Sequence, residues 1–275
     1  MKILITGGTG FIGGHFINMV PDNIKISAIK RSNSKSKIKI NRKVKWVEKD
    51  LTNLVAKDLN NFDCIVHFAS SGVSPQIATK KQLYNINVNC TKSLLKLASE
   101  TGIGRVIMAG SCIEYGLSAN KYKKIPSHAA LLPTTAYGSS KAQAFNYAYK
   151  FCKKSKISLI YNRIFFVFGE GQYEGNLWPS LKKAAITGKD FPMTTGEQIR
   201  DFISVKEVAS AFLRDLSIDP PKNFQPQVKN ICSGKGVSTL KFANYWWKKW
   251  NAKGNLLPGK IPNRSNEPIR FVGKL

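Results

Sequence analysis

The sequence predicts an α/β fold, a doubly wound parallel sheet followed by a small C-terminal lobe. Short apolar runs that suit buried strands alternate with helix-length segments along the first two thirds of the chain. The chain opens with an apolar strand that runs directly into a glycine-rich turn and a helix. Small polar and charged residues follow the expected strands, at the carboxyl ends where such sheets bind their ligands.

The first element is an apolar strand over residues 1–6, and a glycine-rich turn follows it. Gly8, Gly10 and Gly13 fit the G-x-G-x-x-G pattern of dinucleotide-binding (Rossmann) domains, and a helix is expected over residues 11–20. Gly10 allows a pyrophosphate to approach the free N–H groups of that helix, and Gly13 allows close packing on the strand. An ordinary tight turn is the alternative. The cofactor contacts expected in this turn are Gly7, Thr9, Gly10, Phe11, Ile12 and Gly13.

Composition and charge narrow the class of protein. The 275 residues contain no apolar run of the roughly 18 residues that span a bilayer. Five scattered cysteines without a C-x-x-C spacing suit reduced thiols and not a zinc site. We therefore expect a soluble, cytoplasmic protein with no metal. The net charge of +27 attracts dinucleotides, nucleotide sugars or nucleic acid, although lysines spread over the whole chain also suit a solvated surface.

A second strand is expected over residues 24–29, and it ends in Lys30, Arg31 and Ser32. Domains that bind NAD commonly carry an acidic residue here for the ribose hydroxyls. A carboxylate repels a 2′-phosphate, whereas an ammonium and a guanidinium pair with it. These residues therefore favour NADP(H), unless they are simply two more basic surface residues. The lysine-rich residues 33–43 are expected to form a mobile loop.

The later strands end in residues suited to ligand binding. Strands are expected over residues 44–47, 64–69 and 105–109, and helices over residues 84–101 and 135–153. Because the carboxyl ends of parallel strands meet at one edge of a sheet, the residues that follow them should lie together. These residues are Asp50 and Leu51, Ser70 and Ser71, and Ser111.

Tyr137 and Lys141 stand four residues apart near the start of an expected helix, so they share one helix face. A phenol with a pKa near 10 is a poor acid–base group at neutral pH unless its phenolate is stabilised, and a nearby cation does that. Lys141 can also reach the ribose of a bound dinucleotide, and Ser111 can hydrogen-bond a substrate carbonyl. The alternative is that this pair occurs by chance.

Together these residues resemble the extended short-chain dehydrogenase/reductase family, in particular its nucleotide-sugar epimerases, dehydratases and 4-ketoreductases. The resemblance covers nearly the whole chain. It rests on residues 6–13, 50–52 and 67–69, on Asn87 ahead of Thr91, on Ser111 five residues before Gly116, on residues 137–141, on Arg163 ahead of residues 167–169, and on residues 200–203.

The resemblance implies that Ser111, Tyr137 and Lys141 form a catalytic triad and that Asp50 and Leu51 contact the adenine. It also assigns residues 176–179, Arg200 and Arg264 to a nucleotide-sugar site, where the guanidinium groups of the two arginines suit a pyrophosphate. The expected cofactor contacts beyond the glycine turn are Lys30, Arg31, Ser32, Asp50, Leu51, Phe68, Ala69, Ser70, Asn87, Tyr137, Lys141, Phe166 and Val167. The expected substrate contacts are Ser71, Ser111, Cys112, Glu114, Asn176, Leu177, Arg200 and Arg264.

The chain also departs from the family pattern. Phe166 stands where many members have an Asn that touches the sugar, and Cys90 stands where a Gly is usual. The 4,6-dehydratases of the family carry an Asp–Glu pair directly after the catalytic hydroxyl residue. Here those positions hold Cys112 and Ile113, which disfavours a dehydratase. Glu114 comes one residue later, and it either contacts the sugar or is structural.

The leading hypothesis is an NADPH-dependent reductase of the C4 keto group of a nucleotide-linked 4-keto-6-deoxy sugar, with Tyr137 as proton donor. Residues 111–116 and 196–202 look most like those of CDP-abequose and CDP-paratose synthases. The alternative is an NAD-dependent nucleotide-sugar 4-epimerase. A nucleic-acid-binding protein on a reductase scaffold is a third hypothesis, which the intact Ser111, Tyr137 and Lys141 disfavour.

We expect a dinucleotide-binding domain over residues 1–168, to which residues 200–215 and 228–233 return. A small nucleotide-sugar-binding lobe is expected over residues 169–275. The resemblance also implies a homodimer, formed through the helices expected over residues 84–101 and 135–153.

Overall fold

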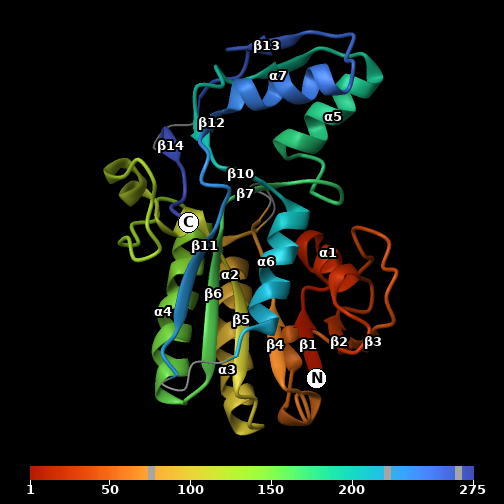
Figure 1. The fold of residues 1–275 in the computed structure, drawn as a ribbon, viewed down its shortest axis with the longest axis vertical. Helices are drawn as coiled ribbons and strands as arrows, with labels where there is room; N and C mark the ends of the chain where they lie inside the picture. The colour runs from red at the N-terminus through yellow and green to blue at the C-terminus, as the bar shows by residue number, and fades with distance from the viewer. Residues whose placement is uncertain (74–77, 220–223, 264–267) are drawn as a thin grey trace.

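The computed structural model describes residues 1–73, 78–219, 224–263 and 268–275. Its centre is a sheet of seven parallel strands (Figure 1). These strands are β1 (Lys2–Thr6), β2 (Lys25–Lys30), β3 (Lys45–Glu48), β4 (Cys64–His67), β5 (Arg105–Ser111), β6 (Ser158–Ile164) and β11 (Gln227–Ile231). Their order is β11-β6-β5-β4-β1-β2-β3, so the chain starts inside the sheet and extends it in both directions. This confirms the predicted doubly wound parallel sheet.

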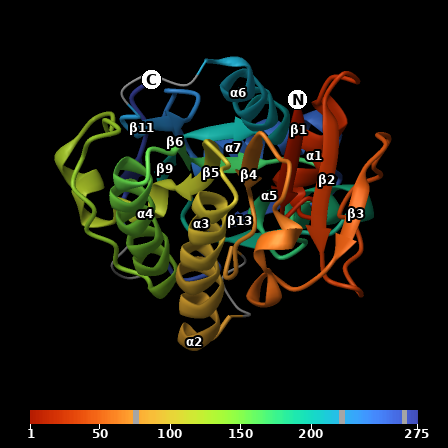
Figure 2. The ribbon, with the colours of Figure 1, turned by 90° about the horizontal axis from the view of Figure 1, so that it is seen from below.

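Helices cover both faces of this sheet. Helices α1 (Phe11–Met19) and α6 (Val205–Ser217) lie on one face, and α3 (Thr91–Glu100) and α4 (Ala136–Lys154) lie on the other (Figure 2). Because both faces are buried at the centre of the sheet, the central strands β1 and β4 are mostly apolar and do not alternate with polar residues, whereas the edge strand β3 contains no buried residue.

Successive residues of β1 show how the two cores divide. Ile3 and Ile5 pack in the cluster that contains residues of α1 and α6, whereas Leu4 packs in the cluster that contains residues of α3 and α4. All three side chains are fully buried. The period of two along a strand therefore separates the two layers of helices.

The segment expected as one helix over residues 84–101 has an earlier start and an internal irregularity. It begins with α2 (Lys80–Leu83), where the hydroxyl of Thr79 accepts a hydrogen bond from the N–H of Gln82. A π-helical stretch, η3 (Tyr84–Cys90), joins α2 to α3. Wide turns of this kind often occur at functional sites, and this one contains Asn87.

Residues 33–43, expected as a mobile loop, lie along α1 and are tied to it. The N–H of Lys37 donates to the carbonyl of Thr9 at 3.0 Å. The amide of Asn18 donates to the carbonyl of Lys39, and its oxygen accepts the N–H of Asn41. The segment therefore continues the wall of the glycine-rich turn.

The C-terminal lobe lies beyond the carboxyl ends of the sheet strands, where Figure 1 shows α5 and α7 above the sheet. Its core contains Leu181, Met193, Ala243 and Trp247. The chain between Ile164 and its end forms β7 (Phe166–Phe168), α5 (Leu177–Thr187), β8 (Phe191–Met193), β9 (Ile199–Arg200), β10 (Phe202–Ser204), β12 (Val237–Ser238), α7 (Thr239–Lys249), β13 (Leu256–Pro258) and β14 (Arg270–Phe271), besides α6 and β11.

Short helical turns complete the connections. They are η1 (Leu51–Asn53), η2 (Ala56–Asp58), η4 (Cys112–Glu114) and η5 (Leu117–Lys121).

No helix within the described ranges combines the length and the apolar character needed to cross a membrane.

Candidate active site

A cleft of about 2430 Å³ lies between the carboxyl ends of the sheet strands and the small lobe. Nearly all the expected cofactor contacts line it, from the glycine turn, the ends of β2 and β4, the start of α4 and β7. Of the expected substrate contacts, Ser71, Ser111, Asn176, Leu177 and Arg200 line it as well. Arg264 lies outside the described residues. The structure thus brings most of the residues expected from the sequence into one cavity.

The glycine-rich turn is built to leave the start of α1 open. Gly7 has a φ of +73°, and the N–H of Gly10 donates to its carbonyl at 3.0 Å. A Cβ on Gly13 would lie 2.3 Å from the same carbonyl oxygen, so only glycine allows this approach. Gly10 caps α1 without a side-chain hydrogen bond from any described residue, and the first turn of the helix contains no acid. Free N–H groups facing the cleft fit a pyrophosphate.

The basic end of β2 is partly neutralised. Lys30 forms an ion pair with Glu48 at 2.6 Å, so its ammonium is already matched by a carboxylate. Arg31 is exposed and lines the cleft, and Lys35 and Lys37 of the segment along α1 line it too. The sequence did not assign those two lysines to the site because their segment was expected to be a mobile loop.

Asp50 and Leu51 line the same end of the cleft. The carboxylate of Asp50 accepts hydrogen bonds from the N–H and the hydroxyl of Thr52 at 2.9 and 2.7 Å. These bonds, together with the charge of Arg31, hold the pKa of Asp50 below its ordinary value. A charged acceptor therefore lies at this end of the cleft, which suits hydrogen-bond donors of a nucleoside.

His67 at the end of β4 is a structural residue. Its ring nitrogens lie 2.6 Å from the hydroxyl of Thr6 and 3.0 Å from that of Thr91. Complete burial, helped by the nearby charge of Lys141, lowers the pKa of His67 to about 3. The ring is therefore neutral and links β1, β4 and α3.

Asn87 does not line the cleft, which corrects its assignment as a cofactor contact. It is buried in the π-helical stretch and holds the loop after β4 from behind. Its oxygen accepts the N–H of Ser71 at 2.8 Å and the hydroxyl of Ser70 at 3.0 Å. Its amide donates to the carbonyl of Ser71 and to the hydroxyl of Ser140. Asn87 thus fixes two residues that line the cleft.

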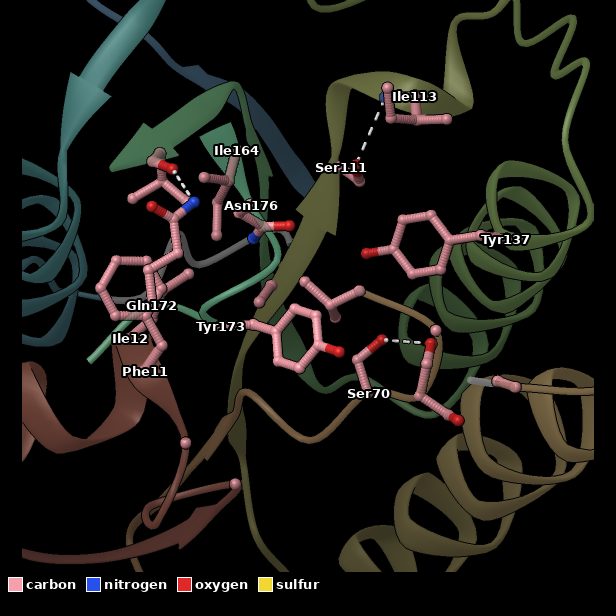
Figure 3. Close-up of a pocket in the computed structure, with 18 of the residues that line it drawn as sticks. Phe11, Ile12, Ser70, Ser111, Ile113, Tyr137, Ile164, Gln172, Tyr173 and Asn176 are labelled. Atoms are coloured by element: carbon pink, nitrogen blue, oxygen red, sulfur yellow. Dashed lines mark hydrogen bonds between the residues drawn. The ribbon is translucent and has the colours of Figure 1, made fainter. Parts of the chain in front are cut away.

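The phenol of Tyr137 points into the cleft between Ser111 and Ser70 (Figure 3). Burial raises the pKa of Tyr137 to about 12, and the charge of Glu114 acts in the same direction. Hydrogen bonds with the hydroxyls of Ser70 and Ser111 act in the opposite direction and lower the pKa of Tyr137. The phenol is therefore protonated at neutral pH and has two hydroxyl partners.

Lys141 lies one helical turn beyond Tyr137, and its side chain is only 4% exposed. Its ammonium donates to the carbonyl of Ala109 in β5 at 2.7 Å. Burial lowers the pKa of Lys141, while the charge of Glu114 raises it. The amine thus lines the cleft next to the sheet and donates this hydrogen bond to the backbone of β5 and not to the phenol.

A tight turn that begins at Ser111 directs Cys112 and Glu114 away from the cleft. This corrects the expected substrate contact of Cys112, and for Glu114 it favours the structural alternative over the sugar contact. The turn η4 places Cys112 in an apolar cluster with Tyr115, and burial raises the pKa of its thiol. Glu114 is fully buried and forms an ion pair with Arg163 at 2.7 Å. Ile113 lines the cleft in their place.

Arg200 faces the cleft from the small lobe but is closely held. It is 4% exposed, and its guanidinium donates to the carbonyls of Pro268 and Ile269. The guanidinium lies 5.1 Å from the ring centre of Phe166, the residue that replaces the usual Asn. The polar contact implied by the family pattern is thus replaced by an aromatic ring that packs on the arginine.

Apart from Phe166 and Trp178, the sequence did not single out the aromatic wall on the lobe side of the cleft. Trp178 lines it, and its buried indole N–H has no hydrogen-bond partner among the described residues. Tyr173 lies in the middle of the cleft, between the glycine turn and Ser70 (Figure 3). Side chains from separate elements meet in this wall, so no spacing in the sequence marks it. Its other aromatic members are Phe166, Phe168, Phe191, Phe202, Phe242 and Phe271.

Comparisons with known proteins agree with this architecture. The UDP-glucose 4-epimerase of Lactobacillus helveticus is 27% identical over 270 residues, which cover 88% of this chain and 79% of that protein. The putative UDP-glucose 4-epimerase of Methanocaldococcus jannaschii is 26% identical, with 86% of this chain and 78% of that protein covered.

Solved structures show the same fold. The UDP-N-acetylglucosamine 4-epimerase from Methanobrevibacter ruminantium M1 superposes with a TM-score of 0.89 at 23% identity, covering 100% of this chain and 89% of that one. An NAD-dependent NDP-hexosamine 5,6-dehydratase of tunicamycin biosynthesis gives a TM-score of 0.85 at 26% identity, with coverage of 100% and 89%. The sequence matches the family model over residues 3–231, and the chain therefore belongs to the NAD dependent epimerase/dehydratase family.

Proposed function

We propose that the chain is a nucleotide-sugar 4-epimerase that works with a bound nicotinamide dinucleotide. The observation that carries the proposal is the phenol of Tyr137 in the cleft, flanked by Ser111, with the open N-terminus of α1 lining the same cleft. The 4-epimerases among the relatives add support. This proposal takes the place of the 4-ketoreductase as the leading hypothesis, because neither the family nor those relatives point to that branch.

The described residues fit a dinucleotide. Such a cofactor, when bound, supplies reversible hydride transfer. The free N–H groups at the start of α1 would bind its pyrophosphate, and Asp50 with Leu51 would hold its adenosine end. Arg31 and Ser32 would contact the adjacent ribose, and Lys141 would contact the other ribose.

Tyr137 would act in its phenolate form, which takes the proton from the C4 hydroxyl of the sugar and returns it to the C4 oxygen once the sugar has turned its other face to the dinucleotide. Because burial raises the pKa of Tyr137, the phenol would first release its own proton to solvent, and a positive charge nearby lowers the cost of the phenolate that remains. Lys141 supplies a positive charge from the same helix face. Ser111 would hold the oxygen at C4 in line with the phenol.

The nucleotide sugar would enter between the sheet and the small lobe. Asn176, Leu177 and Arg200 line that side of the cleft, and the aromatic wall offers faces for a sugar or a base. We propose that residues 1–168 form the dinucleotide-binding domain and residues 169–275 the substrate lobe. Residues of α6 and β11, which pack in the sheet cores, would return to the first domain.

A dehydratase is disfavoured by the positions that follow Ser111. Elimination of water needs one acid to protonate the leaving hydroxyl and a base to remove a proton from C5. Cys112 is buried away from the cleft, Ile113 faces it, and Glu114 is engaged with Arg163. None of the three can serve as that pair of groups.

An NADPH-dependent 4-ketoreductase is the second candidate, and the cations at the end of β2 favour it. Arg31, Lys35 and Lys37 line the cleft there, and a 2′-phosphate pairs with such groups. We expect NADPH to bind at least about tenfold more tightly than NADH, which corresponds to about 1.4 kcal/mol. Arg31→Ala should shrink this preference by weakening NADPH binding alone, as fluorescence titration of both cofactors would measure. Equal affinities in the unchanged protein would contradict this assignment.

Product analysis tests the proposal. The purified protein is incubated without added cofactor with UDP-glucose, UDP-galactose and UDP-N-acetylglucosamine, and proton NMR identifies the sugars formed. Conversion of one C4 epimer into the other supports the epimerase. Consumption of NADPH with a nucleotide 4-keto-6-deoxy sugar, and no epimerisation in the first assay, would instead establish the reductase.

A further inference from the structure

Glu114 is a buried carboxylate directly behind Ser111, and both of its oxygens accept hydrogen bonds. One of its oxygens accepts the backbone N–H of Ser111 and the hydroxyl of Tyr161, each at 2.7 Å. The other accepts the Nε–H of Arg163 at 2.7 Å. A Cβ on Gly110 would lie 2.9 Å from the carboxylate and 2.3 Å from the Tyr161 ring, so glycine makes room for this arrangement.

Arg163 is itself held on several sides. Its guanidinium donates to the carbonyl of Ser127 at 2.9 Å and lies 4.2 Å from the ring centre of Phe145. It also approaches the hydroxyl of Tyr115 at 3.4 Å. A buried ion pair with its remaining hydrogen bonds satisfied holds one geometry, because any other leaves a charge unpaired in the interior.

The turn that Glu114 closes also sets the direction of the Ser111 hydroxyl. The hydroxyl oxygen accepts the N–H of Ile113 at 3.3 Å, while Glu114 accepts the N–H of Ser111. These reciprocal bonds form a capping box around η4. With one lone pair of its oxygen engaged inside the turn, the hydroxyl hydrogen of Ser111 can turn outward to the phenol of Tyr137.

We propose that Glu114 is a positioning residue: its buried carboxylate, locked by Arg163 and Tyr161, fixes the turn that directs the Ser111 hydroxyl at Tyr137. This inference rests on the proposed function, because it assigns Ser111 and Tyr137 to the reaction. Nothing in it requires Glu114 to touch the substrate. The titratable groups that face Glu114 are Tyr161 and Arg163 of β6, Cys112 and Tyr115 of the turn, and Tyr137 and Lys141 of α4.

Glu114→Gln is the central test. The amide keeps an oxygen that can accept the Ser111 N–H, but it loses the charge that binds Arg163. We expect kcat to fall roughly tenfold, the effect of 1.4 kcal/mol, while KM for the nucleotide sugar changes less than about twofold. Because the charge of Glu114 raises the pKa of Tyr137, the acidic limb of the kcat/KM profile should also move to lower pH.

The chain contains a matched control. Ser204 and Glu207 form the same capping box at the start of α6, but Glu207 is exposed and does not line the cleft. Glu207→Gln should cost some thermal stability and leave kcat and the pH profile as they are. A similar loss of activity in both variants would show that a weakened cap is enough, and would overturn the proposal.

Tyr161→Phe provides a second test of the positioning role if Glu114→Gln does not fold. It removes one donor to the carboxylate and leaves the charge, so kcat should fall severalfold while the pH profile keeps its position. Unchanged kcat in the folded variants would overturn the positioning role.

A second readout separates this inference from the proposed function. In protein labelled with 13C at the tyrosine rings, the Tyr137 signal, assigned with Tyr137→Phe, should titrate at lower pH in Glu114→Gln than in the unchanged protein. This shift is expected even if no nucleotide sugar turns over, in which case only the proposed function fails. An unshifted titration overturns the inference even if the unchanged protein is an active epimerase.

Discussion

Tyr137 shows how a single residue receives its properties from its surroundings. The four-residue spacing between Tyr137 and Lys141, which is visible in the sequence, places both residues on one face of α4. Its raised pKa follows from burial between β5 and the loop after β4, which no local spacing reveals. The chemistry of the residue therefore belongs to the assembled cleft.

Tyr137→Phe is the direct test at this scale. The change keeps the ring and removes the proton that we assign to catalysis. We expect kcat to fall roughly 10²–10⁴-fold, the range for a lost general acid or base, with little change in dinucleotide affinity. Ser111→Ala should be milder, and Lys141→Met should damage both the rate and cofactor binding. Turnover at the unchanged rate by Tyr137→Phe would rule out this mechanism.

Cys112 and Glu114 show what the sequence leaves open at the scale of a residue. The family resemblance implied a substrate contact for both, with a structural role as the alternative for Glu114, but the turn that begins at Ser111 points both into the interior. The S-x-x-E spacing from Ser111 to Glu114 was a signal that could have been used, since it is typical of a capping box. The partner Arg163 lies 49 residues away, and no rule of spacing links it to Glu114.

Among the elements, the strand, glycine turn and α1 were predictable because their constraints are local. The positive φ of Gly7 and the closeness of Gly13 to its carbonyl both act within one turn of chain. The course of residues 33–43 was not predictable, because it depends on Asn18 and Thr9 in a neighbouring element. The rest of the aromatic wall, beyond Phe166 and Trp178, was missed for the same reason.

Gly13→Ala tests the turn. The added Cβ would lie 2.3 Å from the Gly7 carbonyl oxygen, so the helix must move away from the strand. We expect a loss of about 1–3 kcal/mol in the free energy of unfolding, the usual cost of overpacking, and weaker dinucleotide binding. Gly104→Ala is the control, because a Cβ there meets nothing within 4 Å in the described structure. Equal stability of the two variants by urea denaturation would contradict the packing described.

At the scale of the whole molecule, the doubly wound sheet was predictable from the alternation of apolar runs, and the structure confirms it. The existence of a small lobe was predictable because residues remain after the sheet, but its internal structure was not, since its short strands pair across long stretches of sequence. The homodimer through α3 and α4 stays a prediction, and so does the boundary at residue 168.

Buried phenols and thiols should make the whole molecule sensitive to alkali. Burial raises the pKa of Tyr115 and of Cys64 to about 12 in the folded protein. The unfolded chain loses these protons near their ordinary pKa values of about 10 and about 8.5, so it binds fewer protons than the folded chain between those values and 12. The free energy of unfolding should therefore fall as pH rises from about 8.5 towards 12. Urea denaturation at a series of pH values measures this, and a flat profile would contradict the burial.

The central claim is that the hydrogen at C4 of a nucleotide sugar leaves and returns to the same carbon inside this cleft. A nucleotide sugar that carries deuterium at C4 tests it most directly, with NMR of the product formed in ordinary water. The account predicts that the C4 epimer appears and retains its deuterium, and that Tyr137→Phe forms almost none. An epimer that has lost its deuterium to the solvent, or no epimer from any nucleotide sugar that the protein binds, would contradict it.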